Sequence, residues 1–205
     1  MGDMEWLKYI QEIFGSCCTD NCCTHNKMFV LWGDGSNGKT TFMELMQKVL
    51  GALIIKKVPS DVISDAGFNQ KIPITTKIIL IEEDDCNFQP DVAVIKSLLA
   101  TDSSIRICLI TNGYLKFPNN EFLNDQIIVI PFCAKFVYNA QGNNEFTKKS
   151  FILDELSSDG TILTALVNWM LEGAKLSGGA PGCVEVAIDE YLSECANRVR
   201  WANIY

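Results

Sequence analysis

Four short apolar runs constrain the fold of this chain more than any other feature of its sequence. They lie at residues 28–32, 77–81, 105–111 and 127–131. A continuous apolar run of this length is typical of a strand whose two faces are both covered, as in a parallel sheet. Residues 53–55 start a further strand or extended segment. Stretches with helical spacing alternate with these runs, which predicts an α/β fold with a mostly parallel, doubly wound sheet.

The helices are predicted from apolar spacing and from glycine stop signals. They fall at residues 4–14, 40–50, 92–100 and 160–174, and Gly15 and Gly51 end the first two. Residues 139–144 and 177–182 have the composition of loops. We therefore divide the chain into an N-terminal helix with a cysteine-rich turn (1–27), a core (28–138) and a C-terminal helical region (139–205).

Composition sets limits on partners and location. With 205 residues and 48% hydrophobic content, the chain can bury a core of one domain. The net charge of −8 excludes a broad basic surface for duplex DNA, so any nucleic-acid contact must be local, such as a few lysines lining a pore. No apolar stretch approaches the ~20 residues of a membrane span. Asp3 and Glu5 stand where an export signal would be basic, so we expect no membrane partner, no secretion and a cytoplasmic setting.

The nine cysteines are an odd number in a chain without an export signal, so reduced thiols are expected. Five residues of one polar turn have loose metal-ligand spacing: Cys17, Cys18, Cys22, Cys23 and His25. No second CxxC pair or HxxxH partner completes a zinc pattern, so a reduced surface loop is the preferred interpretation and zinc the alternative. Because the chain has one histidine, acid–base chemistry by histidine is not expected.

A glycine-rich loop follows the first apolar run. It reads Gly33-Asp34-Gly35-Ser36-Asn37-Gly38-Lys39-Thr40, followed by Thr41, and it fits the pattern G-x-x-x-x-G-K-[ST]. In that pattern the glycines let backbone N–H groups surround a phosphate, the lysine reaches the β and γ phosphates, and the hydroxyl holds Mg²⁺. A strand before the loop and a helix after it are the required context. The loop therefore predicts a binding site for ATP and Mg²⁺ formed by residues 33–41.

Carboxylates follow the second apolar run directly, in the order Glu82-Glu83-Asp84-Asp85. A nucleoside triphosphatase needs one carboxylate to support the metal and one to orient or deprotonate the attacking water. We predict Thr40, Glu82 and Glu83 at the metal, with Glu83 catalytic. The alternative interpretation is a solvated acidic turn.

Asn112 ends the third apolar run, where its amide can hydrogen-bond the γ-phosphate or the attacking water. Taken alone, Asn112 followed by Gly113 is an ordinary turn. Its order after the other two motifs favours the functional interpretation.

These three motifs, with the wording GDGSNGKTTF, ILIEED and LITN, resemble the superfamily 3 helicases. Within that group the chain is similar to the primase-helicases of poxvirus-like viruses, phages and plasmids. The resemblance continues to the C-terminus and covers about residues 28–199, through Ile130-Pro131-Phe132, Phe136-Val137, residues 169–174, Pro181, Val184 and Glu190-Tyr191.

The resemblance implies an AAA+ type fold and a hexameric ring that hydrolyses ATP between its subunits. Single-stranded DNA would pass through the ring pore, during replication of a virus or mobile element at a replication site in the host cell. By position, Lys39 and Thr40 bind phosphate and Mg²⁺, Glu83 is the catalytic carboxylate with Glu82 beside it, and Asn112 is the sensor.

Two departures from the family pattern affect the expected activity. Asp125 and Gln126 occupy places where relatives carry paired arginines, and residues 102–112 are too few for the relatives' lysine-bearing DNA hairpin. The only arginines are Arg106, Arg198 and Arg200. Since an arginine finger contributes about 10³ to 10⁵ in rate, we expect slow hydrolysis and weak unwinding.

Two rival functions remain open. One is a non-catalytic nucleotide-binding paralogue that acts as an assembly or loading partner; the other is a small-molecule kinase, which would need an arginine-rich lid.

Two sets of residues are better explained by structure than by contacts with nucleic acid. Solvated surface is preferred over pore contacts for Lys56, Lys57, Lys71 and Lys77. Packing is preferred over base stacking for Trp6, Trp32, Trp169 and Trp201.

Overall fold

The computed structural model describes residues 3–16, 27–51, 54–58, 72, 76–83, 92–101, 105–113 and 126–176. The elements of its first part are α1 (Asp3–Gly15), β1 (Met28–Trp32), α2 (Lys39–Leu50), β2 (Ile54–Val58), β3 (Ile78–Glu83) and α3 (Val92–Thr101). They continue with β4 (Arg106–Thr111), β5 (Ile127–Pro131), β6 (Lys135–Val137), β7 (Glu145–Thr147), α5 (Ile152–Ser158) and α6 (Gly160–Lys175).

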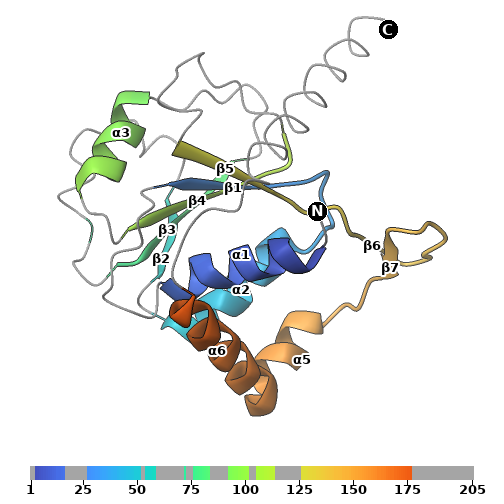
Figure 1. The fold of residues 1–205 in the computed structure, drawn as a ribbon. Coiled ribbons are helices and arrows are strands. Elements are labelled where there is room, and N and C mark those ends of the chain that lie inside the picture. The colour runs from blue at the N-terminus through green and yellow to red at the C-terminus, as the bar shows by residue number, and fades with distance from the viewer. Residues whose placement is uncertain are drawn as a thin grey trace, which may run out of the picture.

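The centre of the fold is a five-stranded sheet in the order β2-β3-β4-β1-β5, and all of its strand pairs are parallel. The prediction of an α/β fold with a mostly parallel sheet is confirmed. Parallel neighbours need crossover connections, and helices therefore lie on both faces of the sheet. Figure 1 shows α3 on one face and α1, α2 and α6 on the other.

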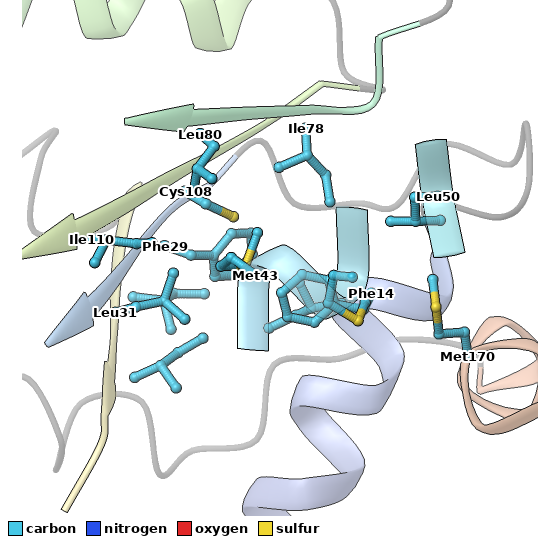
Figure 2. Packing of buried hydrophobic residues seen from close by; sticks show 14 of the residues in the cluster. Phe14, Phe29, Leu31, Met43, Leu50, Ile78, Leu80, Cys108, Ile110 and Met170 are labelled. Atoms are coloured by element: carbon cyan, nitrogen blue, oxygen red, sulfur yellow. The ribbon is translucent and has the colours of Figure 1, made fainter. Parts of the chain in front are cut away.

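Both faces of the sheet are buried, which explains why the strands read as continuous apolar runs. Successive side chains along a strand point to opposite faces. On the α3 face, residues such as Val30 and Ile81 pack with Ile95 and Leu99 of α3. On the α2 face, Figure 2 shows strand residues meeting Phe14 of α1, Met43 of α2 and Met170 of α6.

Helices α1 and α6 approach each other closely through glycines. A Cβ atom on Gly173 would overlap the backbone oxygen of Gln11, and one on Gly15 would overlap the backbone around Met170. The side chain of Gln11 also donates a hydrogen bond to the Trp169 carbonyl at 2.7 Å. These contacts join the beginning and the end of the described chain on the α2 face. None of the helices in these described ranges is long and apolar enough to cross a membrane.

The structure agrees with the predicted strands and helices to within a few residues and adds three short elements. Helix α2 begins at Lys39, and β3 extends through Glu83, so that the two glutamates end the strand instead of following it. The strands β6 and β7 and the helix α5 were not predicted. They are three, three and seven residues long and have exposed or half-buried side chains, so they lack the apolar pattern that marks longer elements.

Candidate functional site

The glycine-rich loop, residues 33–40, connects the end of β1 to the start of α2. Three of its residues have positive φ angles: Gly35 at 88°, Ser36 at 50° and Gly38 at 87°. Glycine adopts such angles at little cost, whereas Ser36 is the one described non-glycine residue with a positive φ. The N-terminus of α2 has no side-chain cap. Its first N–H groups and the positive end of its dipole therefore face the loop, as in an anion site.

Lys39 is 3% exposed, although lysine is almost never buried without partners. Its Nζ donates hydrogen bonds to the Gly33 carbonyl at 2.8 Å, to Asn37 Oδ1 at 2.8 Å and to Asn112 Oδ1 at 2.9 Å. Two of these acceptors belong to the loop itself, and the third comes from the end of β4. The loop thus holds a positive charge near its centre.

Asn37 connects this lysine to the strand on the other side of β1. It is 6% exposed, and its Nδ2 donates to the Phe132 carbonyl at 3.1 Å while its Oδ1 accepts from Lys39. A Cβ atom on Gly33 would overlap the Asn37 amide nitrogen and would lie 2.6 Å from the Phe132 oxygen. Only glycine at position 33 leaves room for this arrangement.

The strand ends bring the two glutamates to the same edge of the sheet as the loop. Glu83 lies opposite Thr111, and Thr111 lies opposite Trp32, the last residue of β1. Since neighbouring strands are about 4.8 Å apart, the Glu83 backbone is about 10 Å from that of Trp32. Both glutamates are half-buried. The edge therefore carries carboxylates within side-chain reach of a group bound at the loop.

The pleat assigns the two glutamates to different faces of the sheet. Glu82 continues the alternation of Ile78 and Leu80, which pack on the α2 face, whereas Glu83 continues that of Ile79 and Ile81 on the α3 face. By the same alternation Asn112 belongs to the α2 face, as its hydrogen bond to Lys39 requires. Glu82, Asn112 and the start of α2 therefore share one face.

These groups fit a nucleoside triphosphate with a divalent cation. The helix N-terminus and the Lys39 ammonium group are the positive groups that phosphates favour, and Thr40 in the first turn of α2 is exposed. Mg²⁺ in proteins is commonly held by one or two carboxylates together with substrate phosphates and water. Thr40, Glu82 and Glu83 are the residues that would supply protein ligands.

The remaining predicted positions lie as follows. Asp34 is exposed, and Thr41 is half-buried in α2. Gln126 directly precedes β5 and is half-buried. Arg106 is 3% exposed. Because it is the first residue of β4, its backbone lies about 17 Å, the length of that strand, from the edge that carries the loop.

Several predictions fall outside the described residues or side chains. They concern the cysteine turn with His25, the side chains of Lys56 and Lys57, and Lys71, Asp84, Asp85, Asp125, Arg198, Arg200 and Trp201. Of the other tryptophans, Trp32 is 9% exposed in the core, and Trp6 and Trp169 pack against the cluster on the α2 face. The packing interpretation is confirmed for these three.

Two residues that touch the loop were not assigned to the site from the sequence. The Phe132 carbonyl accepts from Asn37, and the Phe136 N–H donates to the Ser36 carbonyl at 2.7 Å. A ring carbon of Phe136 lies 3.3 Å from where a Cβ on Gly38 would be. The only sequence signal for them was the resemblance of the segment after β5 to the helicase family.

Comparison with known proteins supports the fold. No family model matches the chain, and no curated protein does. Solved structures of the NrS-1 C-terminal region match it. An apo structure of residues 305–718 has a TM-score of 0.60 at 13% identity and covers 92% of this chain and 48% of that one. The A-form apo structure has a TM-score of 0.56 at 10% identity, with coverages of 86% and 43%. The chain therefore shares the fold of part of the NrS-1 C-terminal region and spans less than half the length of those structures.

Proposed function

We propose that this chain is a P-loop ATPase domain of the superfamily 3 helicase type, from the replication protein of a virus or mobile element. The observation that carries the proposal is Lys39, whose ammonium group is buried inside a glycine-rich loop between a parallel strand and a helix N-terminus. That combination suits the phosphates of ATP. The motif resemblance and the fold shared with the NrS-1 C-terminal region favour a role in replication.

Each residue of the site has a role in the proposed hydrolysis. Lys39 and the loop N–H groups bind the β and γ phosphates, and Thr40 and Glu82 hold Mg²⁺. When bound there, Mg²⁺ would supply charge stabilisation to the phosphoryl group being transferred. Glu83 accepts the proton of the attacking water, and the Asn112 amide orients that water or the γ-phosphate. By resemblance, the chain acts in a hexameric ring on single-stranded DNA.

The experiment that tests this proposal is ATP binding by Lys39→Ala, with Lys48→Ala as the matched control. Lys48 lies on the same helix but is exposed in its last turn. We expect Lys39→Ala to lose binding of a labelled ATP analogue and Lys48→Ala to bind as the wild type does. Thermal unfolding of both variants checks that they are folded. Tight binding by folded Lys39→Ala contradicts the P-loop assignment.

A second candidate function is a nucleotide-binding subunit without efficient catalysis, which serves as an assembly or loading partner. It is favoured by Gln126 at a place where relatives carry an arginine and by the burial of Arg106 away from the loop. ATPase turnover with and without single-stranded DNA separates the two. ATP binding without turnover, under conditions where the chain is assembled, supports this candidate.

A further inference from the structure

The segment 135–151 carries an unusual number of exposed aromatic rings. It contains β6, β7 and their flanks and is called the ribbon below. Phe136 is 36% exposed, Phe146 51%, Phe151 76% and Tyr138 77%. The rings of Phe136 and Phe146 pair across the two strands with centroids 5.8 Å apart. Figure 1 shows the ribbon apart from the central sheet, with its connecting loop reaching away from the body. Clustered exposed aromatics of this kind mark an interaction site.

The ribbon is positively charged in an acidic protein. Three lysines (Lys135, Lys148 and Lys149) stand against one glutamate, Glu145, which gives +2 in a chain with a net charge of −8. All three lysines are exposed. Glu145 is engaged within its own turn, where its Oε2 accepts from the N–H groups of Gln141 at 2.9 Å and Gly142 at 3.0 Å. These two hydrogen bonds lower the pKa of Glu145. Glu145 therefore stays ionised, and the net charge of the ribbon remains +2 because its three lysines outnumber this one carboxylate.

Aromatic and basic side chains alternate closely enough to act together. The Lys148 ammonium lies 5.8 Å from the centroid of the Tyr138 ring. Aromatic rings stack unpaired bases of any sequence, and lysines beside them neutralise the backbone phosphates. A duplex hides its bases and needs a broader basic surface than this acidic chain offers. The core of a protein–protein interface is depleted in lysine, so a second copy of the chain fits the ribbon less well.

We propose that the ribbon binds single-stranded nucleic acid, with bases stacked on Tyr138, Phe146 and Phe151 and phosphates held by Lys148 and Lys149. The choice of this polymer rests on the proposed function as a replication ATPase. The ribbon is also joined to the glycine-rich loop, because the Phe136 N–H donates to the Ser36 carbonyl and its ring covers Gly38. A nucleic-acid strand bound to the ribbon would therefore lie close to Phe136, which itself contacts the loop.

Fluorescence anisotropy of the full chain with a labelled oligothymidine of about 20 nucleotides tests the proposal. The variants are Tyr138→Ala and the double variant Lys148→Ala/Lys149→Ala, and Lys175→Ala is the control, since Lys175 is an exposed lysine on α6. Tyr138→Ala should bind about tenfold or more weakly, as for the loss of one stacked base. The double lysine variant should lower the slope of log K against log salt by about 1.4. Lys175→Ala should bind as the wild type does.

Two measurements make the outcomes distinct. ATP binding should be unchanged in all three variants, and their solution mass should equal that of the wild type. If Tyr138→Ala changes the mass but not oligothymidine binding, the ribbon is an interface between copies and the proposal fails. A wild type that binds ATP but not oligothymidine refutes the ribbon and leaves the proposed nucleotide site standing. A wild type that binds oligothymidine but not ATP refutes the proposed function instead.

Discussion

At the scale of single residues, the site depends on a chain of contacts that runs through the glycine-rich loop. Asn37 accepts from Lys39 and donates to Phe132, and Gly33 leaves room for its amide. Asn37 is therefore a positioning residue, because it aims the buried ammonium group and ties the loop to the end of β5. Loss of one partner would leave buried polar groups unpaired, which costs about 1–3 kcal/mol for each group.

Gly33→Ala should destabilise the protein, because its new methyl group would overlap the Asn37 amide. We expect a loss of about 1–3 kcal/mol in the free energy of unfolding and weaker ATP binding. Gly160→Ala is the control, since a Cβ at Gly160 meets nothing within 4 Å. That control should be neutral or stabilised by up to about 1 kcal/mol. Urea unfolding of both variants provides the comparison. Equal stabilities would mean that the Asn37 side chain can move to another position that avoids the added methyl group.

Glu83→Gln should keep ATP binding yet lose most ATP turnover, because an amide cannot accept the proton of the attacking water. We expect a decrease of about 10² to 10⁴ in turnover, the usual contribution of a general base. Glu82→Gln should instead raise the Mg²⁺ concentration needed for half-maximal activity, since Glu82 lies on the face shared with α2. If only Glu82→Gln is inactive, the two roles are exchanged. If neither change affects ATP turnover, the two carboxylates are solvated groups at the end of β3 without a catalytic role.

At the scale of elements, the packing of α1 against α6 fixes the helical layer on the α2 face. The contact depends on two glycines, Gly15 and Gly173, which bring the helix backbones together. Met170 of α6 is fully buried beside them, in the cluster that also contains Met43 of α2. The layer that supports α2, and with it Lys39, thus includes the first and last described helices.

Gly173→Ala should push α1 and α6 apart, because the added methyl group would overlap the Gln11 carbonyl. The expected loss is about 1–3 kcal/mol in unfolding free energy, reduced by about 0.5–1 kcal/mol because alanine favours helix. Glu172→Ala, at the neighbouring exposed position, removes only a surface ion pair with Lys175 and should cost at most about 1 kcal/mol. Unfolding monitored by circular dichroism measures both. A Gly173→Ala protein as stable as Glu172→Ala would contradict the close packing.

At the scale of the whole molecule, the placement of arginines limits the proposed catalysis. Arg106 is buried at the edge of the sheet opposite the loop, and Gln126 directly precedes β5, where the helicases that the sequence resembles carry an arginine. Among the described residues, Arg106 is the one arginine, and it lies far from the loop. In the proposed reaction, the transition-state charge on the γ-phosphate would therefore lack an arginine from this part of the chain. We expect slow ATPase activity and weak unwinding from the unmodified chain.

Gln126→Arg should raise ATP turnover, because it places a cation where the helicases that the sequence resembles carry their arginine finger. We expect a gain of at least about tenfold, within the 10³ to 10⁵ that such a residue can contribute, and it should grow with protein concentration as rings assemble. Asn168→Arg adds the same charge at an exposed position on α6 and should leave turnover unchanged. Robust DNA-stimulated unwinding by the unmodified chain would contradict the absence of a working finger.

The sequence by itself determined the elements whose signals are local. Continuous apolar runs predicted β1, β3, β4 and β5, because strands covered on both faces must be apolar throughout. Glycines predicted the loop after β1 and the end of α2, because positive φ angles favour that residue. The β6–β7 pair escaped prediction, since three-residue strands with exposed side chains have no such pattern.

Only the tertiary structure decided which distant residues meet. Placing β4 between β1 and β3 brings Asn112 to Lys39, 73 positions away in the sequence, and sets Glu83 two strands from the loop. Neither strand order nor the side of the pleat that Glu82 occupies follows from local patterns. Both depend on how the sheet and helices together bury their apolar faces, which is a property of the whole packed chain.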